Sequence, residues 1–429
     1  MLALCAAVLL QLVGSLAASQ GTAPRPTRVF GPLPPVRTTA PSWQALKRAC
    51  ARSGASTITL SDDFTMGAYD GPIFLNSSKE VTVEGGGATL QAAGMGYFFD
   101  VQGEGTVLQL VNMTLENGFS TLIGGAIQAS VGASVKIRSS VFANNRAVTS
   151  DIHAEGVRWG GAIYVAAGVL EVHDSTFVNN VVSNLVSLPD KGGAIYGSAS
   201  SVTIDNCTFR NNTAEFGGAV YGDAATEMNI ARSMFTLNHA RYGGALYALR
   251  GSATITSSSF DQNRAATSGG GLYVSGVAPF DVTNSSFRGN SAAATDGGGG
   301  AIYAYYATAQ VNGTQFSNNV ASGAGAAVFI LGYVHITMSN SGFQMNKAQR
   351  GGALWADADA PNTALLLGCG FVGNAVGSRG ANDVARGHYN VGGYDSTVTF
   401  GCARGKQGAP VTMKLYELAN PPPDSLKCT

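Results

Sequence analysis

The residues best suited to chemistry gather in one polar stretch near the C-terminal end of the sequence. The segment SRGANDVARGHYN contains Arg379, Asp383, Arg386 and His388. A carboxylate, an imidazole and two guanidinium groups could supply a general base and a cation that holds an acidic substrate. The same composition is typical of a polar terminal turn with an Asp cap, and we favour that interpretation.

The other candidate groups are more isolated. Asp62 and Asp63 are adjacent and predict a turn, and neither His153 nor His173 has a partner at metal-ligand spacing. The glycine run TDGGGGAIY, which begins at Thr295, follows no βαβ pattern, so we do not expect it to bind phosphate. We therefore expect no catalytic residue, no metal ligand and no cofactor site.

Composition limits the classes of partner. The chain has 429 residues, 57 of them glycine, with 12% charged residues and a formal net charge of +0. A nucleic-acid partner would require a concentrated basic surface, which this balance of charge argues against. A chain of this length can bury a large core as one big domain or as several smaller ones.

The N-terminal region is typical of a secreted protein. Residues 1–19 form a short apolar run that ends in small residues, which predicts a signal peptide cut near Ala18 or Ser19. Residues 20–41 are rich in proline and predict an extended linker. No second apolar stretch of that length follows, so we expect no membrane span in the mature chain and a secreted or extracellular location, at the cell wall or cell surface among the alternatives.

Sequons and cysteines fit that location. Six asparagines begin N-x-S/T motifs and are candidate glycosylation sites: Asn76, Asn112, Asn206, Asn211, Asn284 and Asn312. Five cysteines follow the signal segment, so at least one thiol has no partner within the chain. Cys402 and Cys428 lie closest to each other, beyond the repeats described next, and are the expected disulfide.

A repeat dominates the middle of the sequence. Nine phenylalanines are each followed three residues later by asparagine, with neighbouring pairs 25 to 35 residues apart. The pairs are Phe142 and Asn145, Phe177 and Asn180, Phe209 and Asn212, Phe235 and Asn238, Phe260 and Asn263, Phe287 and Asn290, Phe316 and Asn319, Phe343 and Asn346, and Phe371 and Asn374. A Gly-Gly element also recurs once per repeat, as in GGALY at Gly243.

The register within one repeat predicts a coil of three short strands. Apolar residues lie five and mostly seven positions before each Phe, as Ile204 and Val202 do before Phe209, which is the period of a strand with one buried face. The odd spacing from there to Phe requires a bend, and the residue three before Phe is a turn former in eight of the nine repeats. A GGALY-type strand, an ATI-type strand and an SSF-type strand therefore close one coil.

Stacking such coils gives an all-β, single-stranded, right-handed parallel β-helix of about ten or more coils. Phe would stack on Phe, and each Asn would hydrogen bond to the Asn of the next coil and adopt the left-handed conformation at a corner. The first Gly of each pair would allow a sharp turn. Residues 42–400 are the expected domain, with a short helix from Ser42 to Gly54 as its N-terminal cap, and 401–429 form a tail. Cys207 and Cys369, six coils apart, should not bond to each other.

The GGA[ILV] and F-x-x-N signals resemble the repeats of chlamydial polymorphic membrane proteins and of the wider right-handed β-helix family, as in GGAIY at Gly192 and FRNN at Phe209. The resemblance covers roughly Gly124 to Asn374, and it implies a surface protein that acts in adhesion. The segment LKRACARSGASTITL is also similar to the entry cap of secreted β-helix proteins, which include polysaccharide-acting ones.

Two function classes follow. One is a structural, adhesion or glycan-binding module without catalytic activity, whose partners are extracellular glycans or surface proteins. The other is a polysaccharide lyase or glycoside hydrolase with an unfamiliar active site, for which we find neither Gly-His-Gly nor Arg-Ile-Lys motifs. Aligned on Phe, Asp174, Asp205, Asp261 and Asp281 fall at four different positions, so they do not line up on one face. We favour the non-enzyme; the oligomeric state does not follow from the sequence.

Overall fold

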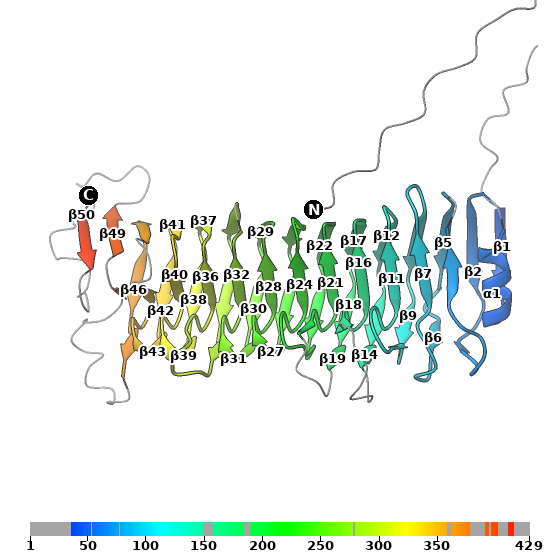
Figure 1. Ribbon diagram of the computed structural model, residues 1–429, viewed down its shortest axis with the longest axis horizontal. Helices are drawn as coiled ribbons and strands as arrows, with labels where there is room; N and C mark the ends of the chain where they lie inside the picture. Colours follow the sequence, from blue (N-terminus) through cyan, green and yellow to red (C-terminus); the bar gives the residue numbers. More distant parts are fainter. Residues whose placement is uncertain are drawn as a thin grey trace, which may run out of the picture. The chain divides into compact units, whose positions relative to one another are not determined.

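The computed structural model describes residues 36–377, apart from 53, 77, 149–157, 184–188, 278 and 358–361, together with 391–393, 396–401 and 411–415. The chain divides into two units, Met1–Pro34 and Pro35–Thr429, and the description below concerns the second. Its strands follow one another in order of sequence through parallel sheets, so each turn of the chain adds one strand to each sheet (Figure 1).

Sheet A contains the strands in which two apolar residues alternate with polar ones. In β22, Val202 and Ile204 are buried while Ser201, Thr203 and Asp205 face outward. Neighbouring strands pair in parallel and in register, apart from the antiparallel pair β49 and β50. The strands are β1 (Val36–Ala40), β2 (Ser56–Leu60), β5 (Glu80–Glu84), β8 (Val107–Val111), β12 (Ser134–Arg138), β17 (Val169–His173), β22 (Ser201–Asp205), β25 (Glu227–Ala231), β29 (Ser252–Thr256), β33 (Phe280–Thr283), β37 (Thr308–Asn312), β41 (His335–Ser339), β45 (Thr363–Leu367), β49 (Ser396–Gly401) and β50 (Val411–Leu415).

Sheet B contains the Phe of each repeat. From Phe142 to Phe371 the rings stack face to face, with centroids 4.7–5.1 Å apart and interplanar angles of 2–10°. The spacing of the rings matches the spacing of paired strands. The strands are β3 (Phe64–Thr65), β6 (Thr89–Gln91), β9 (Thr114–Glu116), β13 (Val141–Ala143), β18 (Thr176–Val178), β23 (Thr208–Arg210), β26 (Met234–Thr236), β30 (Ser259–Asp261), β34 (Ser286–Arg288), β38 (Gln315–Ser317), β42 (Gly342–Gln344) and β46 (Gly370–Val372).

Sheet C follows each Gly-Gly element. The first Gly has a positive φ, as at Gly243 (65°) and Gly269 (68°), which favours glycine. The inward side chains of sheets A, B and C form one continuous apolar core. The strands of sheet C are β4 (Ile73–Leu75), β7 (Phe99–Gln102), β11 (Ile127–Ser130), β16 (Ile163–Ala166), β21 (Ile195–Ser198), β24 (Val220–Asp223), β28 (Leu246–Leu249), β32 (Leu272–Ser275), β36 (Ile302–Tyr305), β40 (Val328–Leu331), β44 (Leu354–Ala356) and β48 (Val391–Gly393).

A fourth short strand corrects the prediction of three strands per coil. It lies between the repeat Asn and the Gly-Gly element and pairs in parallel with its equivalent in the next coil, except after Asn212, where only isolated bridges at Thr213 and Phe216 occur. We call this wall sheet D, although it is interrupted. Its strands are β10 (Phe119–Ser120), β14 (Arg146–Val148), β15 (Arg158–Trp159), β19 (Val181–Ser183), β20 (Asp190–Lys191), β27 (His239–Tyr242), β31 (Arg264–Ser268), β35 (Ser291–Ala292), β39 (Val320–Ala324), β43 (Lys347–Arg350) and β47 (Ala375–Val376).

The bend between sheets A and B lies at the residue three before Phe, and all nine of these residues have positive φ, from Ser139 (48°) to Gly368 (59°). The corner between sheets B and D differs from the expectation. The residue with positive φ is the one before the repeat Asn, as at Asn144 (55°) and Asn179 (56°), so the prediction that the repeat Asn itself is left-handed is wrong. Its side chain is needed inside the coil.

The repeat asparagines form a buried hydrogen-bonded ladder. The Nδ2 of each donates to the Oδ1 of the next, from Asn145 through to Asn374, over 2.8–3.1 Å. The same Nδ2 also donates to a carbonyl of the preceding coil, as Asn263 does to the Phe235 carbonyl at 2.9 Å. Buried amides that are satisfied in this way stabilise a unique arrangement of the coils.

Helix α1 (Trp43–Cys50) lies between β1 and β2 in the chain, and its N-cap Ser42 accepts a hydrogen bond from the Ala45 amide at 3.3 Å. The helix lies against β1, β2 and β4, with Trp43, Leu46 and Cys50 buried (Figure 1). β1 falls within the predicted linker 20–41, and β50 falls within the predicted tail 401–429, so both ranges contribute a strand to sheet A.

Among the described residues, we find no helix with the length and apolar character that a membrane crossing requires.

Candidate functional site

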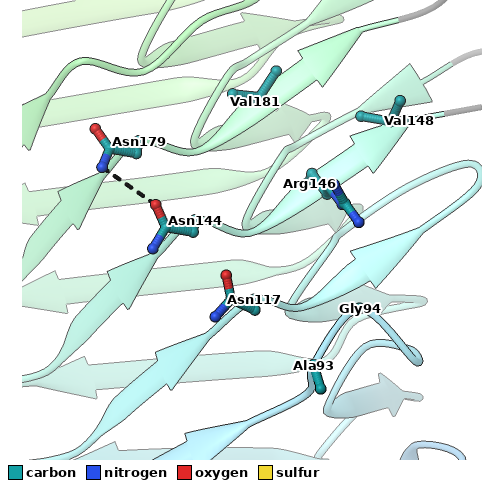
Figure 2. A pocket seen from close by; sticks show the side chains of 8 residues that line it. All are labelled: Ala93, Gly94, Asn117, Asn144, Arg146, Val148, Asn179 and Val181. Atoms are coloured by element: carbon teal, nitrogen blue, oxygen red, sulfur yellow. Dashed lines mark hydrogen bonds between the residues drawn. The ribbon is translucent and has the colours of Figure 1, made fainter. Parts of the chain in front are cut away.

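A groove of about 640 Å³ runs along the corner between sheets B and D in the N-terminal half of the solenoid. One wall is the corner column of residues with positive φ: Ala93, Gly94, Asn117, Asn144 and Asn179. The other wall is formed by side chains of β14 and β19. Figure 2 shows the three asparagines on successive coils, with Arg146 and Val148 on the neighbouring strand.

The asparagine wall is held by side-chain amides that hydrogen bond from coil to coil. Asn179 donates through Nδ2 to Asn144 Oδ1 at 3.2 Å (Figure 2), and Asn144 donates to Glu116 Oε1 at 3.2 Å. Asn117 donates to Gln91 Oε1 at 2.8 Å. Each of these three asparagines donates one amide hydrogen to a side chain of the preceding coil. These hydrogen bonds fix the three side chains, while Asn144 and Asn179 remain exposed. The result is a fixed row of polar groups along one wall.

Arg146 supplies the cation of the groove. Its guanidinium lies over the Phe119 ring, 5.3 Å from the centroid, and a Cβ added at Gly94 would lie 3.3 Å from Nη2. The glycine thus leaves room for the guanidinium, and the ring orients it. Arg146 is exposed, and among the described residues it forms no ion pair.

The chemistry of this groove is that of binding. A guanidinium that has no carboxylate partner favours a carboxylate or sulfate, which it can hold through two parallel hydrogen bonds. The amides beside it can donate to or accept from hydroxyl groups. The described residues that line the groove include no carboxylate, imidazole or thiol that could act as a general base or nucleophile.

A second cluster lies on the outer face of sheet A. Asp205 is 3.6 Å from His173 Nδ1 and forms an ion pair with Arg232, in a cavity of about 270 Å³. Asp205 Oδ1 is buried without a hydrogen bond. Asp174 accepts a hydrogen bond from Asn206 at 2.7 Å in the same region. The coils therefore bring His173, Asp205 and Arg232 together, because neighbouring columns −3 and −4 meet at this corner.

The sequence-predicted candidates are placed as follows. Arg379, Asp383, Arg386, His388 and His153 lie outside the described residues. Asp63 Oδ1 accepts a hydrogen bond from the Thr89 amide of the next coil at 2.7 Å. Within the described residues, no three His, Cys, Asp or Glu side chains are arranged to hold a metal ion.

All six sequon asparagines are exposed. Asn112, Asn206 and Asn284 share the corner between sheets A and B, each with a positive φ. Asn312 ends β37 beside the same corner, whereas Asn211 lies on the corner between sheets B and D and donates to Asn179 Oδ1 at 2.8 Å.

Three cysteines lie in the described residues, and each has a free thiol: Cys50, Cys207 and Cys369. Burial raises the pKa of the Cys50 thiol to about 12 and of the Cys207 thiol to about 11. Cys207 and Cys369 occupy a position that holds serine in other coils, such as Ser233 and Ser258. Like those serines, each cysteine donates to the backbone carbonyl two residues earlier. Cys402 and Cys428 lie outside the described residues.

Arg146 and the outer asparagine column were missed because neither belongs to the repeat. The available signal was the doubling of asparagine, as at Asn144-Asn145 and Asn179-Asn180, where the first residue of each pair faces outward and the second inward.

Comparison with known proteins agrees with this architecture. The family described as "Right handed beta helix region" matches residues 162–319. No curated protein matches the chain. Among solved structures, the chain is similar to "L. reuters 100-23 SRRP", at 14% sequence identity over 86% of this chain and 96% of that chain, with a TM-score of 0.26. The strand pairing and the family match together show that the chain is a right-handed parallel β-helix protein.

Proposed function

We propose that this protein is an extracellular binding module, without catalytic activity, that recognises acidic glycans through the groove at Arg146. The observation that carries the proposal is the exposed guanidinium of Arg146, without an ion pair among the described residues, beside the fixed amides of Asn117, Asn144 and Asn179. A uronic acid or a sulfated sugar offers one anion and several hydroxyls, which complement a guanidinium and a row of amides.

Other features support an extracellular location. The N-terminal segment 1–19 is typical of a signal peptide, and all six sequons present an exposed asparagine. The repeats resemble those of chlamydial polymorphic membrane proteins, which supports a role in adhesion at a surface. The groove and three of the sequons lie on different corners of the coil, so glycans on Asn112, Asn206 and Asn284 would leave the Arg146 groove accessible.

A glycan array that includes uronate-containing and sulfated chains tests this function. We expect the wild-type protein to bind acidic glycans, and Arg146→Gln to weaken that binding by at least about tenfold, since a charge-assisted bond is worth ~1.5–3 kcal/mol. Arg146→Lys should recover part of it. Arg210→Gln, which removes an exposed arginine from sheet B, is the control and should bind as the wild type does. Equal binding by Arg146→Gln would refute the proposal.

The second candidate function is cleavage of a polysaccharide at the cluster on sheet A. The observation in its favour is the partly buried carboxylate of Asp205, whose Oδ1 has no hydrogen bond, beside His173 and Arg232. Incubation with acidic polysaccharides, followed by measurement of new reducing ends and of unsaturated sugars, distinguishes the two functions. Product that disappears in Asp205→Asn would establish the enzyme, and absence of product with retained binding supports the module.

A further inference from the structure

Two tyrosines occupy strained positions on the corner between sheets C and A. Tyr306 has φ 48° and Tyr333 has φ 58°, which is the left-handed region that bulky side chains rarely adopt. Equivalent corners of earlier coils hold residues that are not aromatic in the same conformation, such as Val131, Ala167 and Arg250. The fold therefore does not require an aromatic residue at this corner, and the tyrosines there raise the conformational energy of the coil.

The two rings are also unusually exposed. Tyr306 is 47% exposed and Tyr333 is 55% exposed, with ring centroids 5.7 Å apart and an interplanar angle of 41°. The tyrosines of the ladder on sheet C differ, since Tyr273 and Tyr303 stack with centroids 4.6 Å apart and 12° between their planes. The faces of those ladder rings cover one another, whereas the corner rings present apolar surface to solvent.

The corner rings are held in place by their neighbours. Tyr305, at the end of β36, meets Tyr306 edge to face with centroids 4.5 Å apart. The rings of Tyr305 and Tyr306 lie over Gly332, where an added Cβ would be 2.7 Å from Tyr306 Cε2 and 2.9 Å from Tyr305 Cε2. The glycine at that position allows the rings of Tyr305 and Tyr306 to pack on the backbone. This packing holds Tyr306 rigid within the platform, which we define as the exposed rings of Tyr306 and Tyr333, before any ligand binds.

Polar groups without permanent charge border the platform. Thr308 lies two residues after Tyr306, and His335 two residues after Tyr333; both side chains are exposed at the start of paired strands β37 and β41. His335 Nδ1 is 2.5 Å from Thr363 Oγ1 on the next strand, β45. Aromatic surface with a few placed hydroxyl and imidazole groups is the composition of sites that hold uncharged ligands with both apolar and hydroxyl faces.

We infer that Tyr306 and Tyr333, with Thr308 and His335, form a second binding site, which takes uncharged pyranose residues of a glycan chain. The C–H face of a pyranose ring packs on an aromatic ring, and its equatorial hydroxyls reach the polar border. Because the two tyrosines lie on successive coils, two neighbouring sugars of one chain can each contact a ring. This site lies on a different corner from Arg146 and shares no residue with the Arg146 groove.

The experiment compares variants of the secreted full chain by affinity gel electrophoresis in laminarin, mannan and hydroxyethyl cellulose, three uncharged polysaccharides. We expect at least one of them to retard the wild-type protein. The double variant Tyr306→Gly with Tyr333→Gly should bind at least about tenfold more weakly, while its melting temperature stays the same or rises because the strain is relieved. The double variant Tyr306→Phe with Tyr333→Phe keeps the rings and should keep most of the binding.

Matched controls separate this site from the acidic site. Tyr69→Gly removes another exposed tyrosine, in the first coils, and should not change retardation. Arg146→Gln should retain binding to the uncharged polysaccharide, and the double glycine variant should retain binding to acidic glycans. The experiment can therefore refute one proposed site without refuting the other. Absence of retardation of the wild type, unchanged binding by the double glycine variant, or loss of binding only in step with loss of folded protein would each overturn the inference.

Discussion

The side-chain amide of Asn263 makes four buried hydrogen bonds. It donates to the Phe235 carbonyl and to Asn290 Oδ1, and it accepts from the backbone amide and the Nδ2 of Asn238. Every partner is a buried group of a neighbouring coil, so removal of this one amide leaves donors and acceptors in two coils without partners. The Phe260 ring, three residues earlier, lies between the rings of Phe235 and Phe287.

The first prediction concerns this pair of residues. Asn263→Ala should lower the free energy of unfolding by ~1–3 kcal/mol for the unpaired groups, and Phe260→Ala by ~3–5 kcal/mol for lost transfer energy and the cavity. Gln262→Asn, at the exposed neighbour that has the positive φ, should change it by less than ~0.5 kcal/mol. Chemical denaturation measures all three changes. The same substitutions at Phe235 and Asn238 should behave alike, and loss of glycan binding without loss of stability would show that the repeat has a role beyond structure.

At the scale of the elements, the second glycine of each Gly-Gly pair sets how closely sheet C and sheet D approach the next coil. A Cβ added at Gly270 would lie 2.3 Å from the Gly300 carbonyl oxygen and 2.5 Å from the Ser291 carbonyl oxygen. Both atoms belong to backbone, which cannot move without breaking strand pairing. One coil carries alanine at the equivalent position, Ala326, and this residue is fully buried there.

The second prediction follows from that close approach. Gly270→Ala should destabilise the protein by ~1–3 kcal/mol, the usual range for overpacking a close contact. Ala326→Gly is the matched control in the coil that already accommodates a methyl group, and it should cost only ~0.5–1 kcal/mol. Thermal unfolding of both variants checks the difference. Equal changes in stability would mean that the backbone around Gly270 accommodates a methyl group as well as the coil of Ala326 does.

Much of the secondary structure could be predicted because the same sequence pattern recurs in every repeat. The buried Phe, the bend three residues before it and the turn at the first Gly each recur at fixed spacing. The fourth strand was missed because it is short and only one of its positions recurs, the small apolar residue two after each repeat Asn, as at Ala265. The conformation of the repeat Asn was mistaken because asparagine favours both left-handed corners and buried ladders, and here its neighbour takes the corner.

The candidate sites were harder to predict for a related reason. Arg146, Tyr306 and Tyr333 depart from the repeat, and a departure shows only that a residue is tolerated at the surface. The functional role of such a residue depends on which residues of the next coil lie beside it. Asp205 and His173 illustrate this, since they lie 32 residues apart in sequence and one coil apart in space.

At the scale of the whole molecule, each coil contacts mainly its two neighbours, so its stability is the sum of similar local terms. The chain satisfies the same requirements at every step from coil to coil: a Phe on the Phe stack, an Asn in the ladder and a glycine at the turn into sheet C. If one coil is deleted and the register is kept, the two coils that then meet make the same kind of contacts as the two coil–coil junctions that are lost.

The third prediction uses this property. Deletion of residues 261–287 joins Phe260 to Arg288, restores the F-x-x-N spacing with Asn290, and should give a folded, secreted protein with one coil fewer. Deletion of residues 261–273 removes about half a coil, faces polar residues inward and should prevent folding. Circular dichroism and yield of secreted protein measure both. Folding of the half-coil deletion would show that the ladder does not fix the register.

The asparagine ladder has a direction, and this direction matters while the chain is being made. Each Asn donates its backbone amide and its Nδ2 to an oxygen that belongs to the following coil, as Asn238 does to Asn263. On the ribosome that oxygen does not yet exist when the donor emerges. The newest coil is therefore always incomplete, and the coil that follows completes it. During synthesis we therefore expect each coil to be completed by the one after it, from the first coil toward the last.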